Sequence, residues 1–308
     1  MKDRLVTLIG GGGFLGRYVA QDLLAAGARV RIAQRDPREA LFLKPLGGLG
    51  QTQFVAVDIR KPETVARAVQ GADAVVNLAG TVNGDFQALQ ADGARTVAEA
   101  ATAAGARALV HISAIGADAD SPSAYGRSKA EGEAGVRGAF PTATILRPSL
   151  MFGREDRFVN RFAAMVATSP VVPVMRTGTR FQPVYVADVA QAVVAALGNE
   201  DAQGVALELG GPDILSMGEL IRWIAQAIGR DPLIVELPDM LGGLIAMLGF
   251  LPGAPITLDQ WRMLQQDNVA AGEGLAMLGI TPTPLDAVAP GWLVRYRHNG
   301  RFGARAAA

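Results

Sequence analysis

Short, nearly continuous runs of apolar residues alternate along the first half of the chain with longer segments in which apolar residues recur every three or four positions. An unbroken run predicts a strand covered on both faces, whereas the longer period predicts a helix with one buried side. The predicted strands are Leu5–Ile9, Val30–Gln34, Gln53–Val57, Ala74–Leu78, Ala108–Ile112 and Thr144–Leu146. The predicted helices between them are Arg17–Ala26, Pro62–Gln70, Gln87–Ala104 and Ala124–Arg137.

Repeated β-α-β units predict an α/β protein with a doubly wound parallel sheet, the Rossmann fold, in the strand order 3-2-1-4-5-6. The first domain is expected over residues 1–150, with its sheet completed by about 180–200. Residues 151–180 and 201–308 are expected to form a smaller, mostly helical C-terminal part that meets a substrate or a partner. Its predicted elements are Glu155–Val166, Gln182–Val186, Ala187–Leu197, Val205–Leu209 and Ser216–Ile228.

Composition excludes several classes of protein. Half of the 308 residues are apolar, so the chain can bury a core, and 29 basic residues balance 29 acidic ones. This balance argues against a nucleic-acid-binding surface. With no Cys and two distant His residues, we expect no disulfide and no metal centre. No apolar run is long enough to span a bilayer. We expect a cytoplasmic protein, with peripheral attachment to the inner face of the membrane as the alternative.

Glycines gather where the first predicted strand meets the first predicted helix. Gly10, Gly13 and Gly16 have the spacing G-x-x-G-x-x-G. Such glycines allow a tight turn and let the backbone approach a pyrophosphate, which the N-terminus of the following helix would bind. A glycine cluster alone would indicate only a loop, but its place between strand and helix predicts a dinucleotide site. The predicted contacts are Gly10, Gly12, Gly13, Phe14, Leu15 and Gly16.

The end of the second predicted strand bears on the choice of dinucleotide. NAD-binding proteins usually place an acid there, about twenty residues after the glycines, to bind the ribose. This chain has Gln34 at that place, followed by Arg35 and Asp36. A guanidinium can pair with the 2′-phosphate of NADP, which a carboxylate would repel. We therefore expect Arg35 to favour NADP(H). NAD(H) is the alternative, with Arg35 solvated and Asp36 on the ribose.

The next two strand ends complete the predicted cofactor site. In a doubly wound sheet the ligand lies at the carboxyl ends of the strands, where the strand order reverses. The third predicted strand ends beside the adenine, and the fourth ends beside the pyrophosphate and the nicotinamide ribose. The predicted contacts are Asp58 and Ile59 at the first, and Leu78, Ala79 and Gly80, after Asn77, at the second.

Three further residues predict acid–base chemistry. Ser113 follows the fifth predicted strand, Tyr125 comes twelve residues later, and Lys129 lies four residues beyond Tyr125. Residues four apart share a helix face, so the ammonium would lower the pKa of the phenol toward neutrality. Tyr125 could then act as a proton donor or acceptor, and Ser113 could hold a substrate carbonyl. The alternative is an exposed Tyr and Lys without a catalytic role.

Together these motifs resemble the short-chain dehydrogenase/reductase superfamily in its extended and atypical branches. The resemblance implies Ser113, Tyr125 and Lys129 as catalytic residues, and Tyr125 and Lys129 also as cofactor contacts. It adds Arg147 and Pro148, whose segment lies near the nicotinamide in that group. One departure affects the proton relay, because Gln90 stands where many members carry an Asn.

The second half is similar to a narrower family, the alpha-subcomplex subunit 9 family of respiratory complex I. Its segments Phe152–Asn160, Gln182–Val189, Ile256–Gln260 and Leu278–Leu285 carry this resemblance. The resemblance implies a tightly held nucleotide with a structural role and an association with complex I subunits. Two hypotheses follow. The chain is an accessory or assembly factor of a complex I-like NADH:quinone oxidoreductase, or it is an active NADP(H)-dependent oxidoreductase on a carbonyl or alcohol, such as a quinone or lipid precursor.

Two other segments leave alternatives open. Residues 241–256 carry no charge and could form a buried helical hairpin or a patch that contacts a partner or a membrane surface. The basic tail after Tyr296 could be solvated or could contact anionic lipid headgroups. Arg154–Arg157 opens a predicted helix and could be a capping cluster or a lid over the cofactor.

Overall fold

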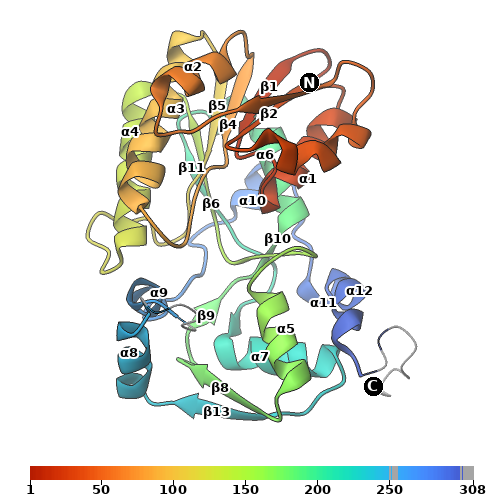
Figure 1. Ribbon diagram of the computed structural model, residues 1–308, viewed down its shortest axis with the longest axis vertical. Helices are drawn as coiled ribbons and strands as arrows, with labels where there is room; N and C mark the ends of the chain where they lie inside the picture. Colours follow the sequence, from red (N-terminus) through yellow and green to blue (C-terminus); the bar gives the residue numbers. More distant parts are fainter. Residues whose placement is uncertain (250, 252–255, 299, 301–308) are drawn as a thin grey trace. The chain divides into compact units, whose positions relative to one another are not determined.

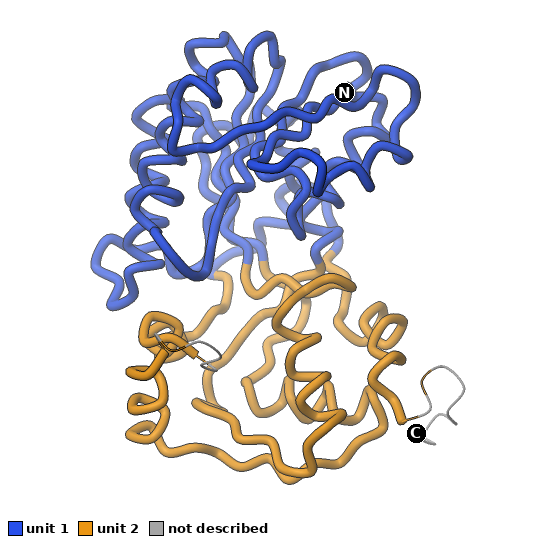
Figure 2. The backbone as a smooth tube through the Cα atoms, viewed as in Figure 1, with its two compact units in different colours: residues 1–148, 186–209, 271–281 blue, residues 149–185, 210–270, 282–308 orange. Residues whose placement is uncertain are grey.

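The computed structural model describes residues 1–249, 251, 256–298 and 300 (Figure 1). Figure 2 shows its two compact units. Unit 1 consists of Met1–Pro148, Val186–Leu209 and Ala271–Thr281, and unit 2 consists of Ser149–Tyr185, Gly210–Ala270 and Pro282–Ala308. The division differs from the predicted domains in two places. Residues 201–209 and 271–281, expected in the C-terminal part, belong to unit 1.

Unit 1 is built on a seven-stranded parallel sheet in the order β3-β2-β1-β4-β5-β6-β11. This confirms the predicted order and adds β11 beyond β6. The strands read as unbroken apolar runs because helices cover both faces of the sheet. They are β1 (Leu5–Ile9), β2 (Arg29–Gln34), β3 (Thr52–Ala56), β4 (Ala74–Asn77), β5 (Ala108–Ile112), β6 (Thr144–Pro148) and β11 (Ala206–Leu209).

Helices α2, α3 and α4 cover one face of this sheet, and α1 and α6 pack against each other on the other (Figure 1). The helices of unit 1 are α1 (Phe14–Ala25), α2 (Pro62–Val69), α3 (Gly93–Ala103), α4 (Ala124–Ala139), α6 (Val186–Ala196) and α10 (Gly274–Met277), with 3₁₀ segments at Pro37–Leu46 and Glu200–Ala202. Small side chains such as Ala94, Ala98 and Ala101 are fully buried in the α2–α3–α4 layer, so these helices lie close to the strands.

One predicted helix of unit 1 is interrupted. The segment predicted as a helix over Gln87–Ala104 begins with a π-helical turn, Gln87–Asp92, and continues as α3. Gly93 lies at the change, where an added Cβ would stand 2.6 Å from Ile59 Cδ1. A π turn inserts an extra residue into the helical ladder and is frequent at functional sites. Here it carries the side chain of Gln90 into the buried interior.

The described part of unit 2 contains three two-stranded sheets and a second hydrophobic core. Its strands are β7 (Met151–Phe152), β8 (Val171–Met175), β9 (Arg180–Phe181), β10 (Val184–Tyr185), β12 (Leu215–Ser216) and β13 (Leu233–Leu237). Its helices are α5 (Val159–Thr168), α7 (Met217–Ala227), α8 (Asp239–Met247), α9 (Leu258–Met263), α11 (Leu285–Val288) and α12 (Pro290–Leu293), followed by a 3₁₀ turn, Val294–Tyr296. Of the strand predicted over Gln182–Val186, only Val184–Tyr185 forms a strand, β10, and Val186 begins α6.

Asp156 caps α5, which favours the capping interpretation of Arg154–Arg157. Its Oδ1 accepts hydrogen bonds from the backbone N–H groups of Val159 (2.6 Å) and Asn160 (3.2 Å). Asn160 in turn accepts a hydrogen bond from Arg295 Nη2 at 2.6 Å. These contacts attach the C-terminal segment to α5 inside unit 2.

The charge-free segment 241–256 is described at 241–249, 251 and 256, and its first part belongs to α8. Large apolar side chains of α8 are exposed, which favours a surface patch over a buried hairpin. None of the helices in the described ranges is long and apolar enough to span a membrane. Of the basic tail, Arg295 and Arg297 form hydrogen bonds within unit 2, whereas Arg301 and Arg305 lie outside the described residues.

Candidate functional site

The glycine loop of unit 1 is shaped by two close approaches. Gly10 has φ +84°, which favours glycine, and an added Cβ would lie 3.3 Å from the backbone N of Ala79 at the end of β4. At Gly16 an added Cβ would lie 2.5 Å from the Gly11 carbonyl oxygen, so helix and loop could not pack as they do. Helix α1 begins at Phe14 without a side-chain cap or an acid in its first turn. Its N-terminal N–H groups are therefore placed to bind an anion.

Gln34, at the end of β2, contacts the glycine loop directly. Its Oε1 accepts a hydrogen bond from the Gly12 N–H at 2.9 Å, and its Nε2 donates to the Asp36 carbonyl at 2.7 Å. Asp36 itself pairs with Arg38 at 2.7 Å, and this hydrogen bond lowers the pKa of the Asp36 carboxyl. Arg35 is exposed and makes no hydrogen bond or ion pair with other described residues. The strand end thus offers a free guanidinium and an acid that already has a partner.

Asp58 and Ile59 occupy the end of β3. Asp58 pairs with Arg60 at 2.6 Å, and the hydrogen bonds from this guanidinium lower the pKa of the Asp58 carboxyl to about 2. The backbone N–H of Asp58 donates to Thr64 Oγ1 at 3.1 Å, which joins the strand end to α2. Ile59 is buried beside Gly93. Asp58 therefore stays ionised across the physiological range, with its charge matched by Arg60.

A buried polar pair lies between the ends of β4 and β5. Asn77 Nδ2 and His111 Nδ1 are 3.2 Å apart, and Asn77 Oδ1 accepts a hydrogen bond from the Ala79 N–H at 3.2 Å. Burial and the charge of Lys129 lower the pKa of His111 to about 3, so its ring is neutral. Sequence reasoning did not predict His111 in the site, because a single His within an apolar strand is typical of a core residue.

The residues predicted to be catalytic meet at the end of β5 and the start of α4. Ser123 caps α4 through a 2.9 Å hydrogen bond from the Gly126 N–H, which fixes the first turn that carries Tyr125. Lys129 Nζ donates to the carbonyl of Ile112 at 3.2 Å, next to Ser113. Ser113 is 3% exposed, and its Oγ is buried without a hydrogen-bond partner among the described residues. An unpaired buried hydroxyl costs stability, so Ser113 Oγ is a candidate donor for a hydrogen bond to a bound ligand.

The expected effect of Lys129 on the phenol is not present in this structure. Burial raises the pKa of Tyr125 to about 12, the opposite of the predicted lowering. Lys129 Nζ lies 5.8 Å from the centre of the Tyr125 ring and is hydrogen-bonded to the backbone instead. Burial also lowers the pKa of Lys129 itself, to about 8, although Glu133 opposes this shift. Phe86 packs edge-on against the Tyr125 ring at 5.9 Å, a contact that no sequence pattern indicated.

Gln90 contributes a second unpaired group. Its Nε2 donates to Ser128 Oγ at 3.2 Å, while its Oε1 is buried and has no partner in the described structure. A Cβ added at Gly80 would lie 3.4 Å from Lys129 Nζ and 3.6 Å from Gln90 Oε1, so both atoms face the end of β4. Gln90 Oε1, carried by the π turn, and Lys129 Nζ therefore both lie near Gly80.

Arg147 and Pro148 end β6. Arg147 forms two hydrogen bonds of 2.7 Å with the carboxylate of Glu133, which is 2% exposed. These bonds raise the pKa of Arg147. The Pro148 carbonyl accepts a hydrogen bond from the Ile115 N–H at 3.2 Å. The side chain of Arg147 thus connects β6 to α4, and only its backbone is available at the strand end.

The chain matches the family model described as "NAD dependent epimerase/dehydratase family" over residues 6–210. The chain belongs to this family. That range covers most of unit 1, including the glycine loop and the residues around Ser113, Tyr125 and Lys129. A dinucleotide therefore fits this site. Gly10 and the start of α1 would hold its pyrophosphate, and Lys129 and Gly80 would border its nicotinamide half.

Relatives extend the similarity over both units. The alpha subcomplex subunit 9 of mitochondrial NADH dehydrogenase [ubiquinone] 1 from Rattus norvegicus is 37% identical over 304 residues, which cover 95% of this chain and 80% of the relative. A ceramide reductase from Caulobacter vibrioides is 33% identical over 277 residues, covering 88% and 83%. The triphenylmethane reductase of Citrobacter sp., solved with NADP(H), shares the fold with a TM-score of 0.77 at 19% identity, over 94% of this chain and 99% of that one. The resemblance to the subunit 9 family is thereby confirmed.

Proposed function

We propose that this protein is an NADP(H)-dependent oxidoreductase that acts on a carbonyl or alcohol carbon. The observation that carries the proposal is the buried Ser113 Oγ, which has no hydrogen-bond partner among the described residues. The residue before it, Ile112, accepts a hydrogen bond from Lys129, which lies on α4 four residues after Tyr125. A protein that only stored a nucleotide would gain stability by filling or removing such groups. Their retention favours chemistry at this position.

The roles follow from the donors and acceptors present. The bound nicotinamide would supply or accept the hydride. Ser113 Oγ would donate a hydrogen bond to the substrate oxygen, and the Tyr125 hydroxyl would give its proton to that oxygen during reduction or take it during oxidation. Lys129 would hold the nicotinamide ribose and favour the phenolate once a ligand draws its ammonium away from the Ile112 carbonyl.

The preference for NADP(H) rests on the end of β2. Arg35 is exposed and unpaired within the described residues, whereas the carboxylate of Asp36 is occupied by Arg38. A 2′-phosphate would find a free guanidinium there, and a ribose hydroxyl would find no free acid.

The proposal is tested with purified protein, NADPH and a panel of quinones, ceramide-class lipids and simple ketones or alcohols. We expect NADPH oxidation with at least one carbonyl substrate and its loss in Tyr125→Phe. The proposal fails if NADPH binds but no member of the panel is turned over faster by the wild type than by Tyr125→Phe.

A second function is favoured by a different observation. The similarity to the rat respiratory subunit covers 95% of this chain, including unit 2, whereas the family model ends at residue 210. Similarity that continues past the dinucleotide domain favours a shared partner as well as a shared cofactor. The protein would then be an accessory or assembly factor of a complex I-like NADH:quinone oxidoreductase, attached to the membrane through that complex.

One experiment separates the two functions. Affinity purification from solubilised membranes is carried out with the wild type and with Tyr125→Phe. Co-isolation of respiratory subunits with both proteins supports the accessory role, because it shows that association with the complex does not require the Tyr125 hydroxyl. Isolation of a free protein that turns over NADPH supports the enzyme alone.

A further inference from the structure

A polar pair in the interior of unit 1 joins the ends of two neighbouring strands. Asn77 ends β4 and lies in register with His111 of β5, and both side chains are 1% exposed. On its other side Asn77 lies in register with Ile9 of β1. The strand order reverses between β1 and β4, and a doubly wound sheet binds its ligand at such a place. The pair therefore lies at the strand ends where the dinucleotide is expected.

The carboxamide of Asn77 has a fixed orientation. Its Oδ1 accepts a hydrogen bond from the Ala79 N–H at 3.2 Å, and a backbone N–H can only donate. Nδ2 must then face the ring of His111, where it lies 3.2 Å from Nδ1. An amide NH₂ group donates and does not accept, so Nδ1 is the acceptor and carries no proton. Because the ring is neutral, its proton lies on Nε2.

These hydrogen bonds lead from β5 to the glycine loop. The backbone N of Ala79 lies 3.3 Å from the place that an added Cβ would take at Gly10. The preceding residue, Leu78, donates its N–H to the Ile9 carbonyl at 2.9 Å. One backbone hydrogen bond and the side chain of Asn77 thus hold the end of β4 against the turn that would bind the pyrophosphate. Without an ordered carboxamide, the Ala79 N–H would lose its acceptor.

Packing alone gives little reason for a histidine at position 111. Its Nε2 is buried and has no hydrogen-bond partner among the described residues, which costs stability. Burial and the charge of Lys129 lower the pKa of the ring to about 3, so the ring neither carries charge nor exchanges a proton near neutral pH. What the imidazole contributes in this structure is the acceptor nitrogen that faces Asn77.

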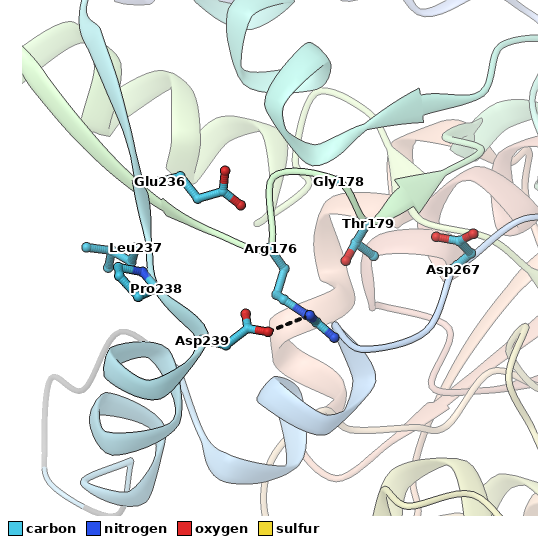
Figure 3. Close-up of a pocket in the computed structure, with 8 residues that line it drawn as sticks. All are labelled: Arg176, Gly178, Thr179, Glu236, Leu237, Pro238, Asp239 and Asp267. Carbon is cyan, nitrogen blue, oxygen red and sulfur yellow. Dashed lines mark hydrogen bonds and ion pairs between the residues drawn. The ribbon is translucent and has the colours of Figure 1, made fainter.

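The polar cleft of unit 2 offers a contrast. It has a volume of about 470 Å³, and its charged groups largely pair with one another (Figure 3). Arg176 pairs with Asp239 at 2.7 Å, and Asp267 pairs with Arg180 at 2.7 Å. Such ion pairs at the surface form without any ligand. A buried imidazole with one nitrogen unpaired is the stronger sign of a functional constraint.

We propose that His111 is a positioning residue of the dinucleotide site. Its Nδ1 holds the Asn77 carboxamide, which holds the Ala79 N–H and keeps the end of β4 in the shape that binds the dinucleotide. His111 acts through Asn77 rather than on the cofactor itself. The inference rests on the dinucleotide binding that the proposed function requires, but it does not depend on turnover.

Two substitutions at His111 separate its acceptor from its volume. His111→Asn keeps an acceptor near the place of Nδ1 in a smaller side chain, whereas His111→Leu keeps the volume and loses the acceptor. We expect His111→Leu to weaken NADPH and NADH alike, by about tenfold, because the contact lies at the pyrophosphate and not at the 2′-phosphate. His111→Asn should bind both within about twofold of the wild type.

Thr7→Val is the matched control. Thr7 is a fully buried residue of β1, and its Oγ1 donates to the Ala68 carbonyl at 3.1 Å. The substitution removes a buried hydrogen bond from the same sheet without affecting the end of β4. It should lower stability in urea denaturation and leave the affinity for both dinucleotides unchanged.

Urea denaturation of the same variants distinguishes positioning from packing. A packing role would make His111→Asn the more damaging change for stability and affinity alike, because it leaves a cavity. A positioning role predicts that His111→Asn is the less stable variant and yet the tighter binder. Equal loss of affinity in both variants, or wild-type affinity in His111→Leu, would overturn this proposal alone. A wild type that binds neither dinucleotide would refute the proposed function as well.

The ring can also be observed directly, without a substitution in the pair. The chain has only two His residues, His111 and His298, so nitrogen-15 labelling of histidine followed by NMR gives two rings, and His298→Gln assigns them. We expect the His111 proton on Nε2, with no titration between about pH 5 and pH 8, both with and without NADPH. A proton on Nδ1, or a titration in this range, would overturn the proposal even if a His111 variant failed to fold.

Discussion

The candidate site of unit 1 and helix α8 of unit 2 depart from ordinary burial in opposite directions. Unit 1 buries polar groups that lack partners among the described residues, Ser113 Oγ, Gln90 Oε1 and His111 Nε2, and it buries the charged Lys129 beside them. Unit 2 exposes large apolar residues along α8. Buried polar atoms and exposed apolar patches are the two arrangements that folding alone does not favour.

Unpaired donors and acceptors at the carboxyl ends of parallel strands agree with a polar cofactor and a reacting oxygen in unit 1. The exposed apolar residues of α8 are a surface feature of unit 2. The family model covers most of the first unit and none of the second after residue 210, so unit 2 is where relatives of this fold can differ in specificity.

Removal of the Tyr125 hydroxyl should have the largest effect on the activity proposed for unit 1. Tyr125→Phe keeps the ring and its edge-on contact with Phe86, but it loses the hydroxyl. We expect turnover to fall by roughly 10²–10⁴-fold, the usual contribution of a positioned acid, with NADPH affinity nearly unchanged. Steady-state rates and NADPH fluorescence titration measure the two effects. Tyr296→Phe, which removes a phenol from unit 2, is the control and should leave turnover intact.

Lys129→Met should separate stability from binding. Burial lowers the pKa of Lys129 from 10.5 to about 8, so the folded protein bears a cost of about 3 kcal/mol for its charge at neutral pH. The substitution removes this cost but leaves the Ile112 carbonyl without its donor. We expect the cofactor-free protein to become about 1–2 kcal/mol more stable in urea denaturation. NADPH affinity should fall about tenfold. A less stable variant would contradict the prediction, and exposed Lys44→Met is the control.

The same residue gives a pH dependence with a defined sign. Below about pH 8 both folded and unfolded chains hold the Lys129 proton, and the cost of burying its charge is fully present. Between about 8 and 10.5 the unfolded chain binds more protons, so the contribution of Lys129 makes wild-type stability rise with pH. The stability advantage of Lys129→Met should therefore disappear as pH rises, and the wild type should become the more stable protein near the upper end of this window in urea denaturation.

Arg35→Ala should reduce the discrimination between cofactors. The exposed guanidinium has no partner among the described residues. Its loss should therefore weaken NADPH binding about tenfold and leave NADH binding nearly unchanged. The ratio of the two dissociation constants, measured by fluorescence titration, checks this. Arg38→Ala frees Asp36 and should improve NADH binding slightly. If NADPH and NADH bind wild type equally, the selectivity assigned to Arg35 is absent.

The sequence predicted those features that depend on local pattern. The six strands, the glycine loop and the spacing of Tyr125 and Lys129 are set by residue type and period, and the structure places them as expected. Features that depend on tertiary packing were not predicted from the sequence. Among these are the contact of Gln34 with Gly12, the pairing of Arg147 with Glu133 and the return of residues 271–281 to unit 1. The rise in the Tyr125 pKa also follows from burial, which a spacing rule does not contain.

The smallest expected effects are changes in stability. They test whether the buried Ser113 hydroxyl of unit 1 and the exposed Leu244 side chain of unit 2 support the fold. Ser113→Ala removes a buried hydroxyl that has no partner in the described structure, so we expect the cofactor-free protein to gain up to about 1 kcal/mol of stability while turnover falls. Leu244→Ser removes an exposed side chain of unit 2 and should change stability by less than about 0.5 kcal/mol. Leu23→Ala and Leu220→Ala, one core residue from each unit, should instead cost about 2–5 kcal/mol in urea denaturation. A large loss in Ser113→Ala would mean that its hydroxyl supports the fold. The buried polar groups of unit 1 would then carry no more functional meaning than its apolar core.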